Sequence, residues 1–438
     1  MRFQRQGSYQ KRGTRTIRQA WVPAFVLCLT AACGAFDSLL EVEAPSRVDA
    51  AILDDPANAS LLVDGAISDF ECALANHILA GGLMGNELID GGLIGAMWHY
   101  DRRTTPTNSG LYLAPCLIAG SLFSAAQVGI YVPLSTARFQ ADNSLTRLEA
   151  WTDAQVTGRN ALIATAAAFA GYGYVLMGEI MCTSAVDGGP ELSPAQLFAL
   201  AETRFTRAMT AAQAAGSADL QNFARVGRAR ARLGQGKKAD ALADAEVVPD
   251  GYVKSATYSR TALRRENRVF AFINRNGSAA IDQPFRDLNF QGVPDGRVSV
   301  TAAGRLAADN VTPLWIQAKY GSEAASIPIA RWAEARLIVA EAQGGQAAVG
   351  IINVLHTRAG LPAFNSTDPA AIQAQIVEER RRELFLESHH IGDLRRYNLP
   401  LFPAPGTPYP PKAGGTYGEQ RCLPLPDVER LNNPSLGG

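Results

Sequence analysis

Helical runs broken by glycine turns constrain the fold of this chain more than any other feature of its sequence. Within residues 220–248, one helical pattern ends at Gly234-Gln235-Gly236, and a second begins at Lys237 and stops before Pro249. Alanine recurs through both runs, at positions 229, 231, 239, 241 and 245. Small side chains let two antiparallel helices approach closely, but a lone hairpin cannot bury its apolar face. The sequence therefore predicts a mainly α fold in which helical hairpins stack on one another.

Further helices are expected on both sides of this hairpin. Ser193-Pro194 has the residue types of an N-cap and a first helical position. Gly344-Gly345 separates two more helical runs, which predicts a second hairpin. Apolar residues at helical spacing and these boundary signals predict helices over about 55–80, 145–181, 195–215, 328–342 and 346–358.

Three other segments lack a helical pattern. The glycine-rich stretch at 81–95 is expected to be a loop, because glycine disfavours helix. Residues 250–327 combine aromatics, proline, glycine and short strand-like runs, and are expected to form an irregular insertion. The tail from about 399 to 438 is rich in proline and glycine and is expected to be mostly extended.

The N-terminus has the pattern of an export signal. Residues 1–32 carry six basic residues and no acidic ones, and end in an uncharged run shorter than the roughly 20 residues that span a bilayer. Ala31-Ala32 precede Cys33, as in a bacterial lipobox, where the cysteine is acylated. The predicted organisation is a signal peptide (1–32), a lipid-anchored tether (33–54) and a single domain (55–438).

Charge argues against a nucleic-acid partner. The chain has 41 basic and 41 acidic residues, but all six basic residues of the signal peptide are lost on cleavage. The remainder has a net charge of about −6, which leaves no basic field for nucleic acid.

The remaining cysteines point to disulfides. Cys28 lies in the signal peptide, whereas Cys72, Cys116, Cys182 and Cys422 form an even set in an exported chain. Four cysteines allow three pairings, which spacing alone does not distinguish. Pairing Cys72 with Cys116 and Cys182 with Cys422 is favoured, because it closes the glycine-rich stretch and ties the tail to a core helix.

Four ordered segments near the C-terminus carry the most specific pattern in the chain. They include Arg331-Trp332-Ala333-Glu334 and Glu378-Glu379-Arg380-Arg381-Arg382-Glu383. The full segments are residues 327–342, 352–361, 378–397 and 423–434. Their combination resembles the SusD/RagB family of outer-membrane nutrient-binding lipoproteins, and the upstream hairpins resemble that family's tetratricopeptide-like core.

The resemblance implies a function. It suggests a lipoprotein at the bacterial outer membrane, anchored through Cys33, that captures an oligosaccharide or another nutrient. It implies delivery to a TonB-dependent (SusC-like) transporter, with no cofactor, no metal and no catalysis.

Two rival functions remain open at this point. The chain contains no HExxH, G-x-S-x-G, Walker A or complete G-x-G-x-x-G motif. Carboxylates are plentiful, however, so a surface glycan hydrolase is one alternative. An envelope tetratricopeptide-type scaffold that binds protein is the other. Reducing-sugar release would favour the hydrolase, and a copurifying soluble assembly would favour the scaffold.

Two aromatic pairs are the candidate ligand-binding residues. Trp98 and Tyr100 follow the glycine-rich stretch, and Trp315 and Tyr320 follow the irregular insertion's polar segment. Sugar rings pack their C–H faces on flat aromatic surfaces while nearby polar groups bind the hydroxyls. The alternative for each of the four is a place in the core.

The charged block after Asp368-Pro369 is expected to be structural. Glu378 and Arg382 are four residues apart and are expected to pair along a helix. A partly buried ion network is expected to join Glu383, Glu387, Asp393 and Arg396.

Overall fold

A computed structural model describes residues 50–92, 97–116, 128–410 and 413–437. The predicted signal peptide and Cys33 lie outside the described residues. Residues 53–438 form one unit, and all contacts described below lie within it.

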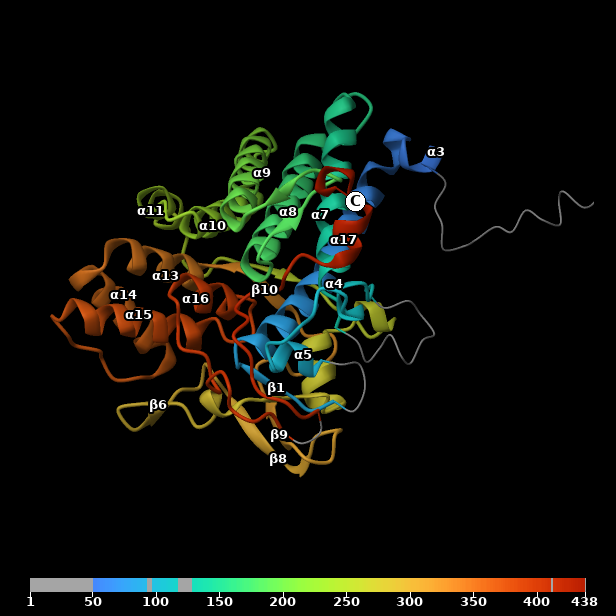
Figure 1. Cartoon of the computed structure of the whole chain (residues 1–438). Helices are drawn as coiled ribbons and strands as arrows, with labels where there is room; N and C mark the ends of the chain where they lie inside the picture. The colour runs from blue at the N-terminus through green and yellow to red at the C-terminus, as the bar shows by residue number, and fades with distance from the viewer. Residues whose placement is uncertain (1–49, 93–96, 117–127, 411–412, 438) are drawn as a thin grey trace, which may run out of the picture. The chain divides into compact units, whose positions relative to one another are not determined.

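The fold is mainly α, as predicted, and its helices follow one another in packed succession (Figure 1). Each of α7 to α10 packs against the next, α11 packs against α13, and α13 packs against α14 and α15. The short α16 packs against α4 and α8. The longer helices are α4 (Ala59–Met84), α7 (Tyr131–Ala150), α8 (Arg159–Ile180), α9 (Pro194–Ala214), α10 (Ala218–Gly234), α11 (Lys238–Ala245), α13 (Trp332–Gln343), α14 (Gly345–Ala359), α15 (Pro369–Glu383) and α16 (His390–Arg396).

Local sequence signals explain where several helices begin. At α9, the Ser193 hydroxyl accepts from the Gln196 N–H, and the Gln196 side chain accepts from the Ser193 N–H, which makes a capping box. At α15, the Asp368 carboxylate accepts from the first two free N–H groups, and proline follows. These caps satisfy backbone donors that a helix start leaves unbonded.

Glycine lets the central helices pack around a cluster of aromatic rings. A Cβ at Gly227 of α10 would lie 2.3 Å from the Phe205 ring, so only glycine fits there. The Phe205 ring meets Tyr172 edge-on at 4.9 Å, and Tyr172 stacks on Phe223 at 4.8 Å. The close approach of α8, α9 and α10 therefore rests on small residues facing large rings.

Three predicted boundaries were wrong in detail. Gly81 and Gly82, expected in a loop, lie in α4. A Cβ at Gly81 would meet Ile391, and one at Gly82 would meet Leu88, each at 3.0 Å, so packing selects glycine and outweighs its low helix propensity. The segment expected as one helix over 145–181 is divided between α7 and α8. The hairpin expected from residue 328 begins with a strand.

Most of the short antiparallel strand pairs involve the insertion at 250–327, which also contains the brief helix α12 (Arg268–Phe270), and one pair lies before it at 184–192. The pair β1–β5 packs through β5 against the β8–β9 hairpin. A small core of Ala280, Ala307 and Leu314 joins them. The pairs are β1 (Leu88–Asp90) with β5 (Ala279–Ile281), β4 (Val253–Ala256) with β10 (Ile327–Arg331), β8 (Val300–Leu306) with β9 (Pro313–Gln317), β2 (Ser184–Ala185) with β3 (Glu191–Leu192), and β6 (Asn289–Phe290) with β7 (Val293–Pro294).

One helix of the described chain, α8, is long and apolar enough to cross a membrane. However, 83% of its most apolar window is buried among the other helices, which is the position of a core helix.

Two disulfides tie distant segments together. Cys72 is bonded to Cys116, and Cys182 is bonded to Cys422, which are the pairs favoured above. Beside the second bond, the Cys182 N–H donates to the Leu423 carbonyl and the Leu423 N–H donates to the Ile180 carbonyl, both at 2.8 Å. The extended tail is therefore fixed to the end of α8, and it ends in the short α17 (Asp427–Asn432).

Candidate functional site

The β8–β9 hairpin carries the best-placed of the candidate aromatic residues. Leu314 and Ile316 pack in the small core, and Trp315, between them, lies on the opposite face of the strand, where it is half-buried against the edge of the main core. Its cross-strand neighbour is Ala302, and both residues line the same hollow. A cavity of about 320 Å³ lies on the hairpin between Trp315 and Arg305. We call this face the Trp315 surface.

A guanidinium fixes the indole on the Trp315 surface. The Arg286 Cζ lies 5.0 Å from the centre of the Trp315 ring, a cation–π distance. Arg286 is itself held by two hydrogen bonds that it donates to the Ile281 carbonyl, at 2.9 and 2.7 Å. A half-buried indole is thus oriented beside two arginine side chains, an arrangement that suits a ligand with both a flat apolar face and hydroxyl groups.

The two candidate tyrosines lie in the core. Tyr100 is 0% exposed and its hydroxyl donates to the Val128 carbonyl at 3.0 Å. Tyr320 is 3% exposed and donates to the Leu386 carbonyl at 2.9 Å. Neither ring faces solvent, so the site proposed below rests on the tryptophans.

Trp98 begins the short helix α5 (Trp98–Asp101), which packs against β1 and α4. Its half-buried ring lies 5.7 Å from that of His99. Strand β1 pairs with β5, and β5 packs on β9, which carries Trp315. Through the contact of α5 with β1, Trp98 therefore borders the same group of small sheets.

A buried acidic group joins α5 to the C-terminal tail. The Asp101 carboxylate accepts from the Asp90 N–H at 2.9 Å and from the Tyr409 hydroxyl at 2.8 Å. Burial raises the pKa of Asp101 to about 7 and that of Asp282 to about 6. A carboxyl with such a pKa is a general acid in some glycosidases, but Asp101 is only 3% exposed beneath the tail and does not face a ligand.

Replacing Asp101 with asparagine is expected to change the pH dependence of stability. Between pH 5 and 7 the folded carboxyl holds a proton that the unfolded one, with a pKa near 3.8, has lost, so this group makes stability fall as pH rises. Asparagine does not ionise and accepts the same two hydrogen bonds. The stability of D101N minus that of the wild type should rise by up to about 1.4 kcal/mol per pH unit, measured by urea unfolding.

Asp250→Asn is the matched control for D101N. Asp250 lies at the surface, and its pKa is lowered by its hydrogen bond with Arg358. Asp250 is therefore ionised in the folded and the unfolded state above pH 5. The difference in stability between D250N and the wild type should not change with pH in that range. A flat difference for D101N would contradict the raised pKa.

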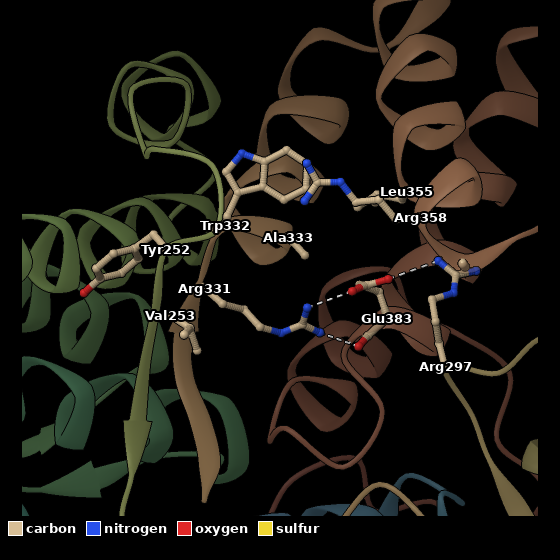
Figure 2. A pocket seen from close by; sticks show the side chains of 11 residues that line it. Tyr252, Val253, Arg297, Arg331, Trp332, Ala333, Leu355, Arg358 and Glu383 are labelled. Carbon is tan, nitrogen blue, oxygen red and sulfur yellow. Dashed lines mark hydrogen bonds and ion pairs between the residues drawn. The ribbon is translucent and has the colours of Figure 1, made fainter.

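A second cleft, of about 270 Å³, lies between the β4–β10 pair and helices α13, α14 and α15 (Figure 2). Figure 2 shows Arg331 and Arg297 both reaching Glu383, at 2.7 and 3.2 Å, at one side of the cleft. At the other side the Arg358 guanidinium lies 3.9 Å from the centre of the Trp332 ring. Trp332 therefore lies against a guanidinium, as Trp315 does, but the contact is closer, and Trp332 is also within 5.8 Å of Arg336.

The single ion network expected around Glu383 was wrong. Glu383 and Glu387 share Arg331, whereas Asp393 binds Arg380 and Arg396 in a separate cluster. The backbone reverses between α15 and α16, where Leu386 and Ser388 have φ of 55° and 70°, so the two acidic groups face different neighbours. The expected pair of Glu378 with Arg382 is present at 2.6 Å.

Sequence reasoning missed the arginines that lie against the two tryptophan rings. Arg286 is 29 residues from Trp315, and Arg358 is 26 residues from Trp332. No spacing rule links them, because the contacts depend on how separate elements pack. In the described part of the chain, no group of three or more His, Cys, Asp or Glu side chains is placed to hold a metal ion.

Comparison with known proteins places the fold. Residues 234–421 match the SusD family. No curated protein sequence matches the chain.

Several solved structures share the fold at low sequence identity. A SusD-like carbohydrate-binding protein from Bacteroides vulgatus superposes with a TM-score of 0.62 at 16% identity, covering 87% of this chain and 97% of that one. A laminarin-binding SusD-like protein gives 0.62 at 15% identity, covering 86% and 98%. A SusD superfamily protein from Bacteroides fragilis gives 0.64 at 13% identity, covering 88% and 99%.

Proposed function

We propose that this chain, which is SusD/RagB-like in fold and in the sequence of residues 234–421, binds an oligosaccharide reversibly and breaks no bond in it. The likeness to two proteins named for carbohydrate and laminarin binding supports the ligand class. The observation that carries the site is the half-buried Trp315 beside a cavity and two arginines.

The Trp315 surface suits capture of a sugar. The indole offers an apolar face to the C–H groups of a pyranose ring, and Arg286 keeps that face in place before the ligand arrives. Arg305, at the cavity, supplies donors for hydroxyl groups. Trp98, in the same group of small sheets, is a second stacking residue for a longer chain.

Trp315→Ala is expected to weaken glycan binding while the protein stays folded. Loss of one stacking contact is worth about 0.5–1.5 kcal/mol beyond the buried area, or about a 2- to 12-fold rise in Kd. A glycan array that includes laminarin would identify the ligand for the full-length protein without its lipid, and calorimetric titration would compare variants.

Trp332→Ala is the matched control, because Trp332 is also half-buried but lies in the cleft of Figure 2. It should leave the Kd unchanged. If W332A loses binding and W315A retains it, the proposed site is wrong. Release of reducing sugar from the bound glycan would contradict the absence of catalysis.

The anchor and the transporter are parts of the same proposal. Cys33 as the acylated first residue would hold the protein at the outer membrane, and a SusC-like TonB-dependent transporter would receive the glycan. Cys33→Ala should move the protein from the membrane fraction to the soluble fraction, and the transporter should copurify with the wild type. Unchanged membrane partition of C33A would contradict the anchor.

A further inference from the structure

A cavity of about 250 Å³ lies among α8, α9, α10, α15 and α16, on different elements from the Trp315 surface. Four arginines line it: Arg230, Arg380, Arg395 and Arg396. Only two carboxylates, Glu179 and Asp393, line it with them. We call it the arginine cavity.

The pairing inside the arginine cavity leaves an excess of positive charge. Arg230 and Glu179 form a bidentate pair at 2.6 and 2.7 Å. Asp393 is shared by Arg380 and Arg396, each at 2.8 Å. Glu341 also accepts from Arg396, although Glu341 does not line the cavity. With Glu341 included, four arginines face three carboxylates.

Arg395 is the arginine without a carboxylate among the described residues. Its guanidinium donates instead to the carbonyls of Gly178, Glu179 and Met181, at 2.7–3.1 Å, at the end of α8. Carbonyl oxygens orient the guanidinium but do not neutralise it. A helix C-terminus also attracts cations, which explains the position of Arg395 but not the other three arginines.

Arg380 supplies an independent sign of a missing acceptor. Its side chain is 4% exposed, and its Nη1 has no hydrogen-bond partner among the described residues. Buried donors are nearly always bonded, and an unbonded guanidinium nitrogen is among the costliest exceptions. The atom is closed off from solvent in this structure, so an anion in the cavity, which Arg380 lines, would bond it only after a small movement of the side chain.

The other wall of the arginine cavity is apolar, formed by Phe198 and Leu233. The volume is below the roughly 300–1,000 Å³ of pockets for drug-sized ligands, so only a small molecule fits.

Two further titratable groups lie near Arg230. Burial raises the pKa of Glu334 to about 7, and burial lowers the pKa of His389. At neutral pH His389 is uncharged and Glu334 is partly ionised, so Glu334 offsets part of the positive charge of Arg230 but not all of the excess.

We infer that the arginine cavity binds a small molecule carrying one carboxylate and a short apolar part. A planar carboxylate matches the two-donor geometry of guanidinium groups, and its single charge matches the excess of one arginine. The apolar part would pack against Phe198. The inference is independent of the glycan-binding proposal, because it involves none of the residues of the Trp315 surface.

Calorimetric titration of the full-length protein with acetate, benzoate, glucuronate and neutral benzamide tests the inference. Acetate and benzoate should bind, benzoate more tightly than about 1 mM, and benzamide should not. Binding of benzoate without glucuronate is the expected pattern, whereas binding of glucuronate without benzoate would contradict the apolar part of the inferred ligand. Failure of every carboxylate, or equal binding of benzamide, would overturn it.

Pro194→Glu provides a variant that should still fold. Pro194 is a half-buried lining residue at the first position of α9, where an acidic side chain is favourable to the helix. The new charge should raise the Kd for benzoate about fivefold by repulsion. Pro194→Gln has nearly the same shape without the charge and should leave the Kd unchanged. Equal effects of P194E and P194Q would contradict an anion site.

Discussion

Arg230→Met is expected to lower the free energy of unfolding by about 3–5 kcal/mol. Arg230 and Glu179 are 6% and 10% exposed, and Glu179 pairs with no other cation among the described residues. Methionine keeps much of the apolar length of arginine but leaves a buried carboxylate without its counter-charge. The cost comes mainly from that stranded charge, and urea unfolding followed by circular dichroism measures it.

A second substitution separates the stranded charge from lost packing. Adding Glu179→Gln removes the uncompensated carboxylate, so the double variant should regain most of the lost stability. Burial already raises the pKa of Glu179, and loss of Arg230 should raise it further. A raised folded pKa means that protonation stabilises the folded state, so R230M should be less destabilised at pH 5 than at pH 8.

Arg358→Met is the matched control for R230M. Arg358 also makes two contacts with one carboxylate, Asp250, at 2.9 and 2.8 Å, but the side chains are 47% and 66% exposed. Solvent screens such pairs, so R358M should lower stability much less than R230M does. Equal losses in R230M and R358M would contradict the role given to burial.

The helical core was predictable because its signals are local. Ser193-Pro194 and Asp368-Pro369 mark helix starts through chemistry confined to four or five residues. Prediction failed where the residue type was selected by a contact with a segment distant in sequence. Gly81 is helical because Ile391, about 310 residues away in sequence, packs against it, and no local propensity contains that information.

The ligand site was predictable only in part for a similar reason. Residue type singles out Trp315 as a stacking residue, and strand alternation explains why it lies on the opposite face from Leu314 and stays half-buried. The same residue-type argument also selected Tyr100 and Tyr320, which are buried with their hydroxyls bonded to backbone carbonyls. Exposure separates the two cases, and exposure depends on the packing of the small sheets.

Removing the Cys182–Cys422 bond by alanine substitution of both residues is expected to cost about 5 kcal/mol of stability. In the chain-entropy account, a disulfide restricts the unfolded chain, and the restriction grows with the length of the closed loop. The two cysteines are 240 residues apart in sequence. Without the bond, the tail keeps its noncovalent contacts, among them the two hydrogen bonds around Leu423 and those that Arg103 donates to the Phe402 and Gly418 carbonyls, so the expected loss is that of the covalent restriction.

The Cys72–Cys116 bond gives the matched comparison, because it closes only 44 residues. Its removal should cost about 4 kcal/mol, so the long-range bond should be the more costly to lose by about 1 kcal/mol. Urea unfolding of the two double-alanine variants measures both values. Limited proteolysis adds a local test, since the Cys182/Cys422 variant alone should be cleaved faster in the tail beyond residue 399. If the short-loop variant is clearly the less stable one, loop length does not govern these bonds, and packing around Cys72, which is 2% exposed in α4, does so instead.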